Sequence, residues 1–179
     1  IMGAFNTPSY DAQFPVRFAW SGDTFGQGYG INPQFGGVKI YDAIREHTPD
    51  IFIHCGDRIY ADQPLKPLRG GGGGRRWYNL LTPEVQKVAE TLDEFRGYYR
   101  YPMLDAPTKR LAQMCSHLFL WDDHEVKNDW WPGRQLRDRR YKTRDCSTLA
   151  KNSRRAFFEY TPVPPQWIQS QRIYRKRPF

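Results

Sequence analysis

Three short apolar segments of this chain each end in acidic residues, and this repeated ending restricts the fold more than any other feature. The first segment, residues 16–23 (VRFAWSGD), alternates apolar and polar positions, and the second, residues 50–57 (DIFIHCGD), is almost continuously apolar. The third, residues 117–121 (HLFLW), runs directly into the acidic stretch DDHE at residues 122–125. Such segments are typical of β-strands. The sequence therefore predicts three strands with acidic side chains at their ends.

The segment between the first two strands predicts that the strands run parallel. In residues 38–47 (VKIYDAIREH), the apolar residues Val38, Tyr41 and Ile44 recur at helical spacing. A strand, a helix and a second strand in this order form a βαβ unit, whose strands are parallel. The carboxyl ends of parallel strands meet at one edge of the sheet, where sites commonly form. We therefore expect an α/β fold that gathers the acids at one edge.

The remaining segments are assigned from composition and periodicity. Thr82 and Pro83 suit the start of a helix, and an apolar stripe predicts that this helix continues to residue 101. Five consecutive glycines favour a loop in the stretch before it. The expected elements are a loop at 64–81, helices at 82–101, 109–114 and 147–160, and a strand at 171–179.

The chain is basic, which favours anionic partners without identifying them. The formal net charge of its 179 residues is +8 at pH 7. A basic surface attracts phosphorylated molecules, nucleic acid or anionic lipid, but a solvated basic face is an equally good explanation. No apolar stretch reaches the roughly 20 residues that span a bilayer. The three cysteines, Cys55, Cys115 and Cys146, form no CxxC pair and are expected to be buried free thiols.

Acids at strand ends have two interpretations, turns and a metal site. A single Gly-Asp after a strand is most often a turn, and the acids at 122–125 also suit the start of a helix. Three such endings in one sheet would bring carboxylates together, and these repel one another unless a cation lies between them. Carboxylate, imidazole and phenolate donors suit Ca, Mn, Zn or iron. His124 lies among the acids, whereas His47, His54 and His117 are expected to be structural.

Five segments together resemble the PhoD-type alkaline phosphatases, which belong to the calcineurin-like metallophosphoesterases. The segments are RFAWSGDTFGQGYGINPQFGGVKIY from residue 17, PDIFIHCGDRIYAD from 49, KVAETLDEFRGYYRY from 87, LWDDHEVKNDW from 120 and RRAFFEYTPV from 154. The resemblance implies a partial four-layer α/β/β/α metallophosphatase sandwich, truncated at the C-terminus, over residues 16–179. Residues 1–15 would be a linker and the end of an N-terminal β domain.

The resemblance also implies roles for individual residues. Asp23 matches the family's first metal-binding aspartate, Asp57 matches the aspartate that bridges metals, and Tyr60 matches a metal-binding tyrosine. Asp123 stands where the broader class has the asparagine of its Gly-Asn-His motif, and His124 matches the histidine of that motif. His124 would be catalytic, and the other four would hold two or more metal ions, iron and calcium in this family, with Mn or Zn as alternatives.

The expected activity is the hydrolysis of phosphate monoesters and diesters by a metal-activated hydroxide. The substrates would be phosphoesters, with nucleic acid only as a substrate, and the protein would be exported to the periplasm or secreted. Two alternatives remain open from the residues: a metal-dependent nuclease, and a basic nucleic-acid-binding module that uses the loops at 69–76 and 134–144.

Two positions depart from the family pattern, and two others are expected to have lesser roles. Arg58 stands where a small residue or threonine is usual, and it would place a fixed charge beside the metals; Cys55 stands where serine is common. Asn128 is expected to support the site, and Asp62 to be a turn residue. The family's downstream Gly-His-x-His segment does not occur in these 179 residues. We therefore expect weak metal binding and little activity from this chain alone.

Overall fold

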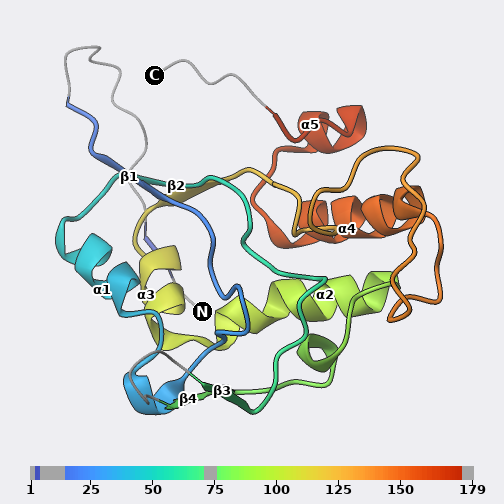
Figure 1. Cartoon of the computed structure of the whole chain (residues 1–179). Helices are drawn as coiled ribbons and strands as arrows, with labels where there is room; N and C mark the ends of the chain where they lie inside the picture. The colour runs from blue at the N-terminus through green and yellow to red at the C-terminus, as the bar shows by residue number, and fades with distance from the viewer. Residues whose placement is uncertain (1–2, 5–14, 71–75, 175–179) are drawn as a thin grey trace.

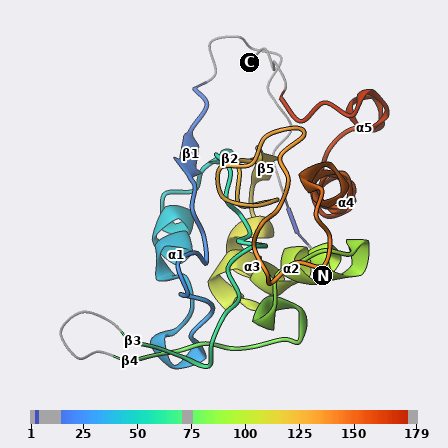
Figure 2. The same ribbon diagram turned by 45° about the vertical axis from the view of Figure 1, so that its right-hand side comes forward.

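A parallel sheet of three strands forms the centre of the fold. The computed structural model describes residues 3–4, 15–70 and 76–174. The strands are β1 (Phe18–Ser21), β2 (Ile51–His54) and β5 (Ser116–Phe119). β2 lies in the middle and pairs in parallel with both neighbours (Figures 1 and 2). Since helix α1 (Lys39–Glu46) connects β1 to β2, the predicted βαβ unit is confirmed.

One face of this sheet is covered by two helices that lie side by side, α1 and α3 (Ala106–Ala112) (Figure 1). A small apolar cluster of Tyr41, Phe52, Leu111 and Cys115 joins the helices to the sheet. Side chains alternate between the faces of a strand. Ile51 and Ile53, which precede and follow Phe52 along β2, therefore point to the opposite side.

The opposite face of the sheet is largely open. Phe18 and Trp20, which point to this face from β1, are 56% and 67% exposed. The parallel register places Ile51 and Ile53 of β2 beside them. The described residues therefore form one helical layer and one sheet of the predicted sandwich, with an apolar sheet face exposed to solvent.

A second, larger core lies beside the sheet, where α2 (Leu92–Arg100) packs against α4 (Cys146–Tyr160) (Figure 1). Phe95, Leu149 and Phe157 are fully buried in it. Asp145 is the N-cap of α4, and its carboxylate accepts hydrogen bonds from the backbone N–H groups of Ser147 and Thr148 in the first turn. The helix predicted at 147–160 is therefore confirmed. A short helix, α5 (Pro165–Ser170), follows it.

The helix predicted at 82–101 is wrong in its first half. That region has a short 3-10 helix, η3 (Glu84–Gln86), followed by extended backbone at Lys87. α2 begins only after Thr91, whose side chain accepts a hydrogen bond from the backbone N–H of Glu94 while the Glu94 carboxylate accepts one from the backbone N–H of Thr91. This capping box starts a new helix inside a segment whose apolar spacing indicated a single one.

Replacement of Thr91 by alanine is expected to destabilise the chain by about 1 kcal/mol, because the first turn of α2 loses its cap. Thr82→Ala is the matched control, since Thr82 is not the N-cap residue of η3 or of α2. Urea unfolding measures both. A larger loss for Thr82→Ala would support a helix that starts at residue 82 and contradict the structure.

Other segments also differ from the expectations. The predicted loop at 64–81 contains an antiparallel pair of strands, β3 (Leu68–Gly70) and β4 (Arg76–Tyr78), and the glycine-rich connection at 71–75 lies outside the described residues. The predicted final strand is absent from its described part, since residues 171–174 are not in a strand, while 175–179 lie outside it. The short helix expected at 109–114 occurs as α3, three residues earlier at its start.

The remaining expectations concern the cysteines, the first residues and the membrane. Cys115 and Cys146 are buried free thiols, as expected, but Cys55 is exposed. Of the predicted linker, the structure describes residues 3–4 and 15, and the backbone N–H of Ala4 donates to the carbonyl of Gln113 at 2.8 Å. Within the described ranges, no helix has the length and apolar character needed to cross a bilayer.

Candidate metal centre

The carboxyl ends of β1 and β2 are tied together at the edge where the acids gather. Asp23 and Asp57 follow these strands with φ angles of 53° and 52°, in the left-handed region that aspartate tolerates better than most residues. The backbone N–H of Thr24 donates to the carbonyl of Asp57 at 2.9 Å, and that of Asp23 donates to the carbonyl of Gly56 at 3.3 Å. The two turns therefore fix where both carboxylates lie.

Asp57, Asp123 and His124 form the closest group of metal-binding side chains. One donor atom from each lies within 4.8 Å of the others. The backbone N–H of His124 also donates to Asp57 Oδ1 at 3.2 Å. Burial raises the pKa of Asp57 to about 6, and the nearby charges of Asp122 and Asp123 add to the rise. A cation between these carboxylates would relieve this repulsion, so the donor set fits a metal ion.

Asp23 and Tyr60 lie beside this group. The hydroxyl of Tyr60 donates to Asp23 Oδ1 at 3.1 Å, and its ring lies 4.3 Å from the ring of His124, centroid to centroid. Burial, the charge of Asp57 and the bond to Asp23 all raise the pKa of Tyr60, so the phenol is neutral without a metal. Gly26 leaves room for this ring, because a Cβ there would lie 2.3 Å from Tyr60 Cζ.

His124 is held by Asp62, a residue for which the sequence indicated only a turn. Asp62 does lie in a turn, but its buried carboxylate also contacts His124 Nδ1 at 2.7 Å and accepts a hydrogen bond from the backbone N–H of Asn128 at 3.0 Å. Burial by itself would lower the pKa of His124, but the charges of Asp62, Asp57 and Asp123 raise it above its usual value. Asn128 thus supports the site through its backbone, and Asp62 fixes the imidazole ring.

Glu125 joins the ends of β2 and β5 and was not singled out from the sequence. Its buried carboxylate accepts hydrogen bonds from the backbone N–H groups of Asp57 at 3.1 Å, Arg58 at 2.7 Å and Asp122 at 2.7 Å. Burial raises the pKa of Glu125 to about 7. Because it binds the backbone on both sides, Glu125 sets the separation of Asp57 from Asp123.

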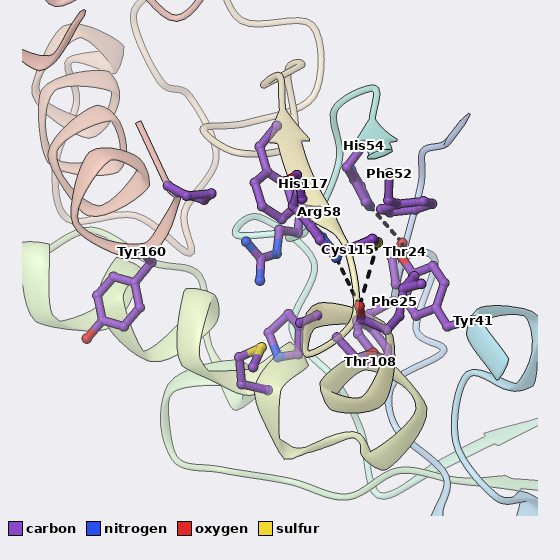
Figure 3. Close-up of a pocket in the computed structure, with 17 residues that line it drawn as sticks. Thr24, Phe25, Tyr41, Phe52, His54, Arg58, Thr108, Cys115, His117 and Tyr160 are labelled. Atoms are coloured by element: carbon purple, nitrogen blue, oxygen red, sulfur yellow. Dashed lines mark hydrogen bonds between the residues drawn. The ribbon is translucent and has the colours of Figure 1, made fainter. Parts of the chain in front are cut away.

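Arg58 does not place its charge in the donor group. Its guanidinium lies over the ring of Phe119, 4.2 Å from the ring centroid, and lines a cavity among apolar side chains (Figure 3). Neither Asp57 nor Asp123 lines that cavity. The backbone therefore directs consecutive side chains to different places, Asp57 to the metal-binding group and Arg58 to the cavity.

Comparison with known proteins shows what the chain is similar to. Residues 18–179 match the sequence model of a family described as PhoD-like phosphatase. The chain belongs to the PhoD-like phosphatase family. A solved structure described as "Structure of PhoD" superposes with a TM-score of 0.59 at 20% sequence identity, and the match covers 92% of this chain and 27% of that one. At this identity the likeness shows the fold alone. No curated protein matches the chain.

Two further histidines of this PhoD-like chain serve the fold, as the sequence predicted. His54 is buried, with Nε2 2.9 Å from the hydroxyl of Thr24, and His117 Nε2 lies 3.4 Å from the carbonyl oxygen of Leu111. Burial lowers the pKa of His54 to about 3 and that of His117 to about 4. Both rings therefore stay neutral at physiological pH.

His117→Gln is expected to resist acid better than the native PhoD-like chain. Unfolded His117 takes up its proton near pH 6.5, but the folded chain does so only near pH 4, so protons stabilise the unfolded state between these values. As the pH falls through this range, the unfolding free energy of the variant should rise relative to that of the native chain by about 1.4 kcal/mol per pH unit. Urea unfolding at pH 7, 6 and 5 measures it. A difference that is independent of pH would contradict the assignment.

The basic run at 134–144 is used largely within the PhoD-like fold. Arg134 donates to the backbone carbonyls of Asn128 and Asp129, and Arg140 pairs with Asp138 and donates to the carbonyl of Asp62. These contacts hold the segment against the turn that carries Asp62. Arg137, Arg139 and Lys142 are exposed, so the run also presents cations to solvent and the nucleic-acid-binding alternative stays a prediction.

Proposed function

We propose that this chain forms part of the catalytic centre of a metal-dependent phosphoesterase that hydrolyses phosphate monoesters and diesters. The observation that carries the proposal is the approach of donor atoms of Asp57, Asp123 and His124 to within 4.8 Å. Membership of the PhoD-like phosphatase family supports it. The proposal concerns the whole protein, since the chain spans 27% of the length of the solved structure it matches.

In this proposal Asp23, Asp57, Tyr60 and Asp123 hold two or more metal ions, iron and calcium, with Mn or Zn as alternatives. Oxygen donors of this kind suit these hard or borderline cations. Bound metals would supply Lewis acidity and an activated water for in-line attack on phosphorus.

In this proposal His124 acts as the catalytic proton donor and not as a metal ligand. Its Nδ1 is held by Asp62 at 2.7 Å, and its Nε2 lies 3.9 Å from Asp123 Oδ1, at the edge of the metal-binding group. Because neighbouring carboxylates raise its pKa, the ring retains a proton more readily than an ordinary histidine. A proton on Nε2 can stabilise charge on a phosphate oxygen or protonate the leaving oxygen.

The test uses the full-length protein with p-nitrophenyl phosphate as a monoester and bis(p-nitrophenyl) phosphate as a diester. We expect both to be hydrolysed, the activity to disappear with a chelator, and added metal to restore it. Activity that a chelator leaves unchanged would contradict the proposal. We further propose that the whole protein is exported and that nucleic acid is at most a substrate.

The 179-residue chain alone is expected to bind metal weakly and to hydrolyse little of either substrate, because four protein donors leave a two-metal site short of ligands. Titration calorimetry with Mn²⁺ measures this. Tight binding at two sites would contradict the expectation.

A further inference from the structure

A cavity of about 510 Å³ lies on the sheet face covered by α1 and α3, apart from the candidate metal centre. Its walls come from β2, β5, α3 and the residues around the end of α4 (Figure 3). Most of the lining side chains are apolar, among them Phe52, Met103, Leu111 and Phe119. The volume falls within the roughly 300–1,000 Å³ of small-molecule sites.

Arg58 brings the permanent charge of this cavity. Of the described residues that line it, none is Asp or Glu. The guanidinium lies over the Phe119 ring, and its buried Nη1 has no hydrogen-bond partner among the residues that the structure describes. The charge of the nearby Glu125 favours this guanidinium, but the oxygens of Glu125 accept hydrogen bonds from backbone N–H groups, including that of Arg58 itself. A buried guanidinium nitrogen without an acceptor is costly, and an anion in the cavity would remove that cost.

A second buried nitrogen lacks a partner in the same cavity lining. His54 Nε2 is 2.9 Å from Thr24 Oγ1, but Nδ1 has no hydrogen-bond partner among the described residues. The cavity therefore combines one cation and one further polar nitrogen with apolar walls. This arrangement matches a molecule that has one anionic end and an apolar body.

We propose that this cavity binds a small amphipathic carboxylate, with its carboxylate on the Arg58 guanidinium and its hydrocarbon or aromatic body against Phe52 and Leu111. One guanidinium offers two parallel N–H donors, which match one carboxylate. A dianion such as inorganic phosphate would leave one charge uncompensated against apolar walls. The site is independent of the proposed phosphoesterase chemistry, because the three residues of the closest donor group do not line it.

The test is calorimetric titration of the purified chain with octanoate in the presence of a chelator, which excludes binding through metal. Octanamide, with the same chain and no charge, is the matched probe. We expect one octanoate per chain, bound at least about tenfold tighter than octanamide, since a charge-assisted pair is worth more than a neutral hydrogen bond. Equal affinities, or no binding of octanoate, would overturn the proposal.

Two variants place the ligand. Arg58→Met should reduce the octanoate affinity to that of octanamide, and Met103→Trp, which fills the cavity, should weaken both. Arg139→Met, at an exposed position outside the lining, should change neither. Octanoate binding that survives Arg58→Met would overturn the assignment of the carboxylate.

Melting temperature separates a binding role of Arg58 from a structural one. Without ligand, Arg58→Met should melt at or above the temperature of the native chain, because a buried guanidinium nitrogen without an acceptor is removed. Octanoate should raise the melting temperature of the native chain more than that of the variant, which binds it no better than octanamide. A marked drop for the ligand-free variant would show that the contact with Phe119 is what Arg58 provides, and would overturn the proposal.

Discussion

Replacement of Asp57 by asparagine is expected to remove most metal binding and, in the absence of metal, to make the chain more stable. Asparagine has the same shape and tolerates the left-handed backbone that Asp57 adopts, so the fold should persist. The amide can still accept the hydrogen bond from the backbone N–H of His124. The variant therefore removes a charge without removing a contact.

The gain in stability follows from the pKa of Asp57, which burial raises to about 6 from the usual 3.8. A raised pKa means that the ionised carboxylate is less stable in the folded chain than in the unfolded chain, so ionisation of Asp57 lowers the free energy of unfolding. The resulting cost is fully present above pH 6 and disappears as the pH falls below about 4. Each pKa unit corresponds to about 1.4 kcal/mol, so Asp57→Asn should be more stable by about 2–3 kcal/mol at pH 7 and equal to the native chain at pH 4.

Although Asp57→Asn should be more stable than the native chain, it should bind metal more weakly. We expect an affinity lower by on the order of 100-fold or more, because a charged ligand is lost. Urea unfolding with a chelator gives the stability, and calorimetric titration with Mn²⁺ gives the affinity. Asp50→Asn, which lies before the first residue of β2 and so at the opposite end of the strand from Asp57, is the control for affinity. A variant that binds metal as the native chain does would contradict the role of Asp57.

Replacement of Glu125 by alanine is expected to destabilise the chain by about 4 kcal/mol or more. It would leave the buried N–H groups of Asp57, Arg58 and Asp122 without their acceptor, and each buried unsatisfied donor costs roughly 1–3 kcal/mol. The cavity left by the side chain adds to the cost. Urea unfolding at pH 7 measures the loss, and a change below about 1 kcal/mol would contradict the bridging role.

Glu125→Gln is the matched variant. Glu125 Oε2 accepts from Asp57 and Asp122, while Oε1 accepts from Arg58. An amide with its oxygen at the Oε2 position keeps two of the three bonds and turns its NH₂ group toward the third donor. We expect a loss of about 1–2 kcal/mol. A glutamine variant as unstable as the alanine variant would indicate that the charge, rather than the acceptor geometry, stabilises the site.

The strands could be predicted from the sequence because their signals are local. The apolar runs at β1, β2 and β5 each end in residues that favour a turn, and the helical spacing of Val38, Tyr41 and Ile44 indicated the crossover helix. The prediction of one helix over residues 82–101 was wrong because the spacing of apolar residues gives no information about helix caps. The side chains of Thr91 and Glu94 cap a new helix there, and the spacing of apolar residues continues across the break.

The site residues could be predicted from the sequence where they lie at the ends of strands. Asp57, Asp123 and His124 do meet, as the parallel topology requires. The roles of Asp62 and Glu125 depend on contacts across more than 60 residues of sequence, which no local pattern contains. The direction of the Arg58 side chain likewise follows from packing against Phe119.

The most direct test of the metal centre is anomalous diffraction from a crystal of the full-length protein grown with Mn²⁺. We expect an anomalous peak within about 2.0–2.3 Å of carboxylate oxygens of both Asp57 and Asp123. The peak should be absent from crystals of Asp57→Asn. Metal peaks that lie only elsewhere, with these carboxylates free of metal, would contradict the proposed metal centre.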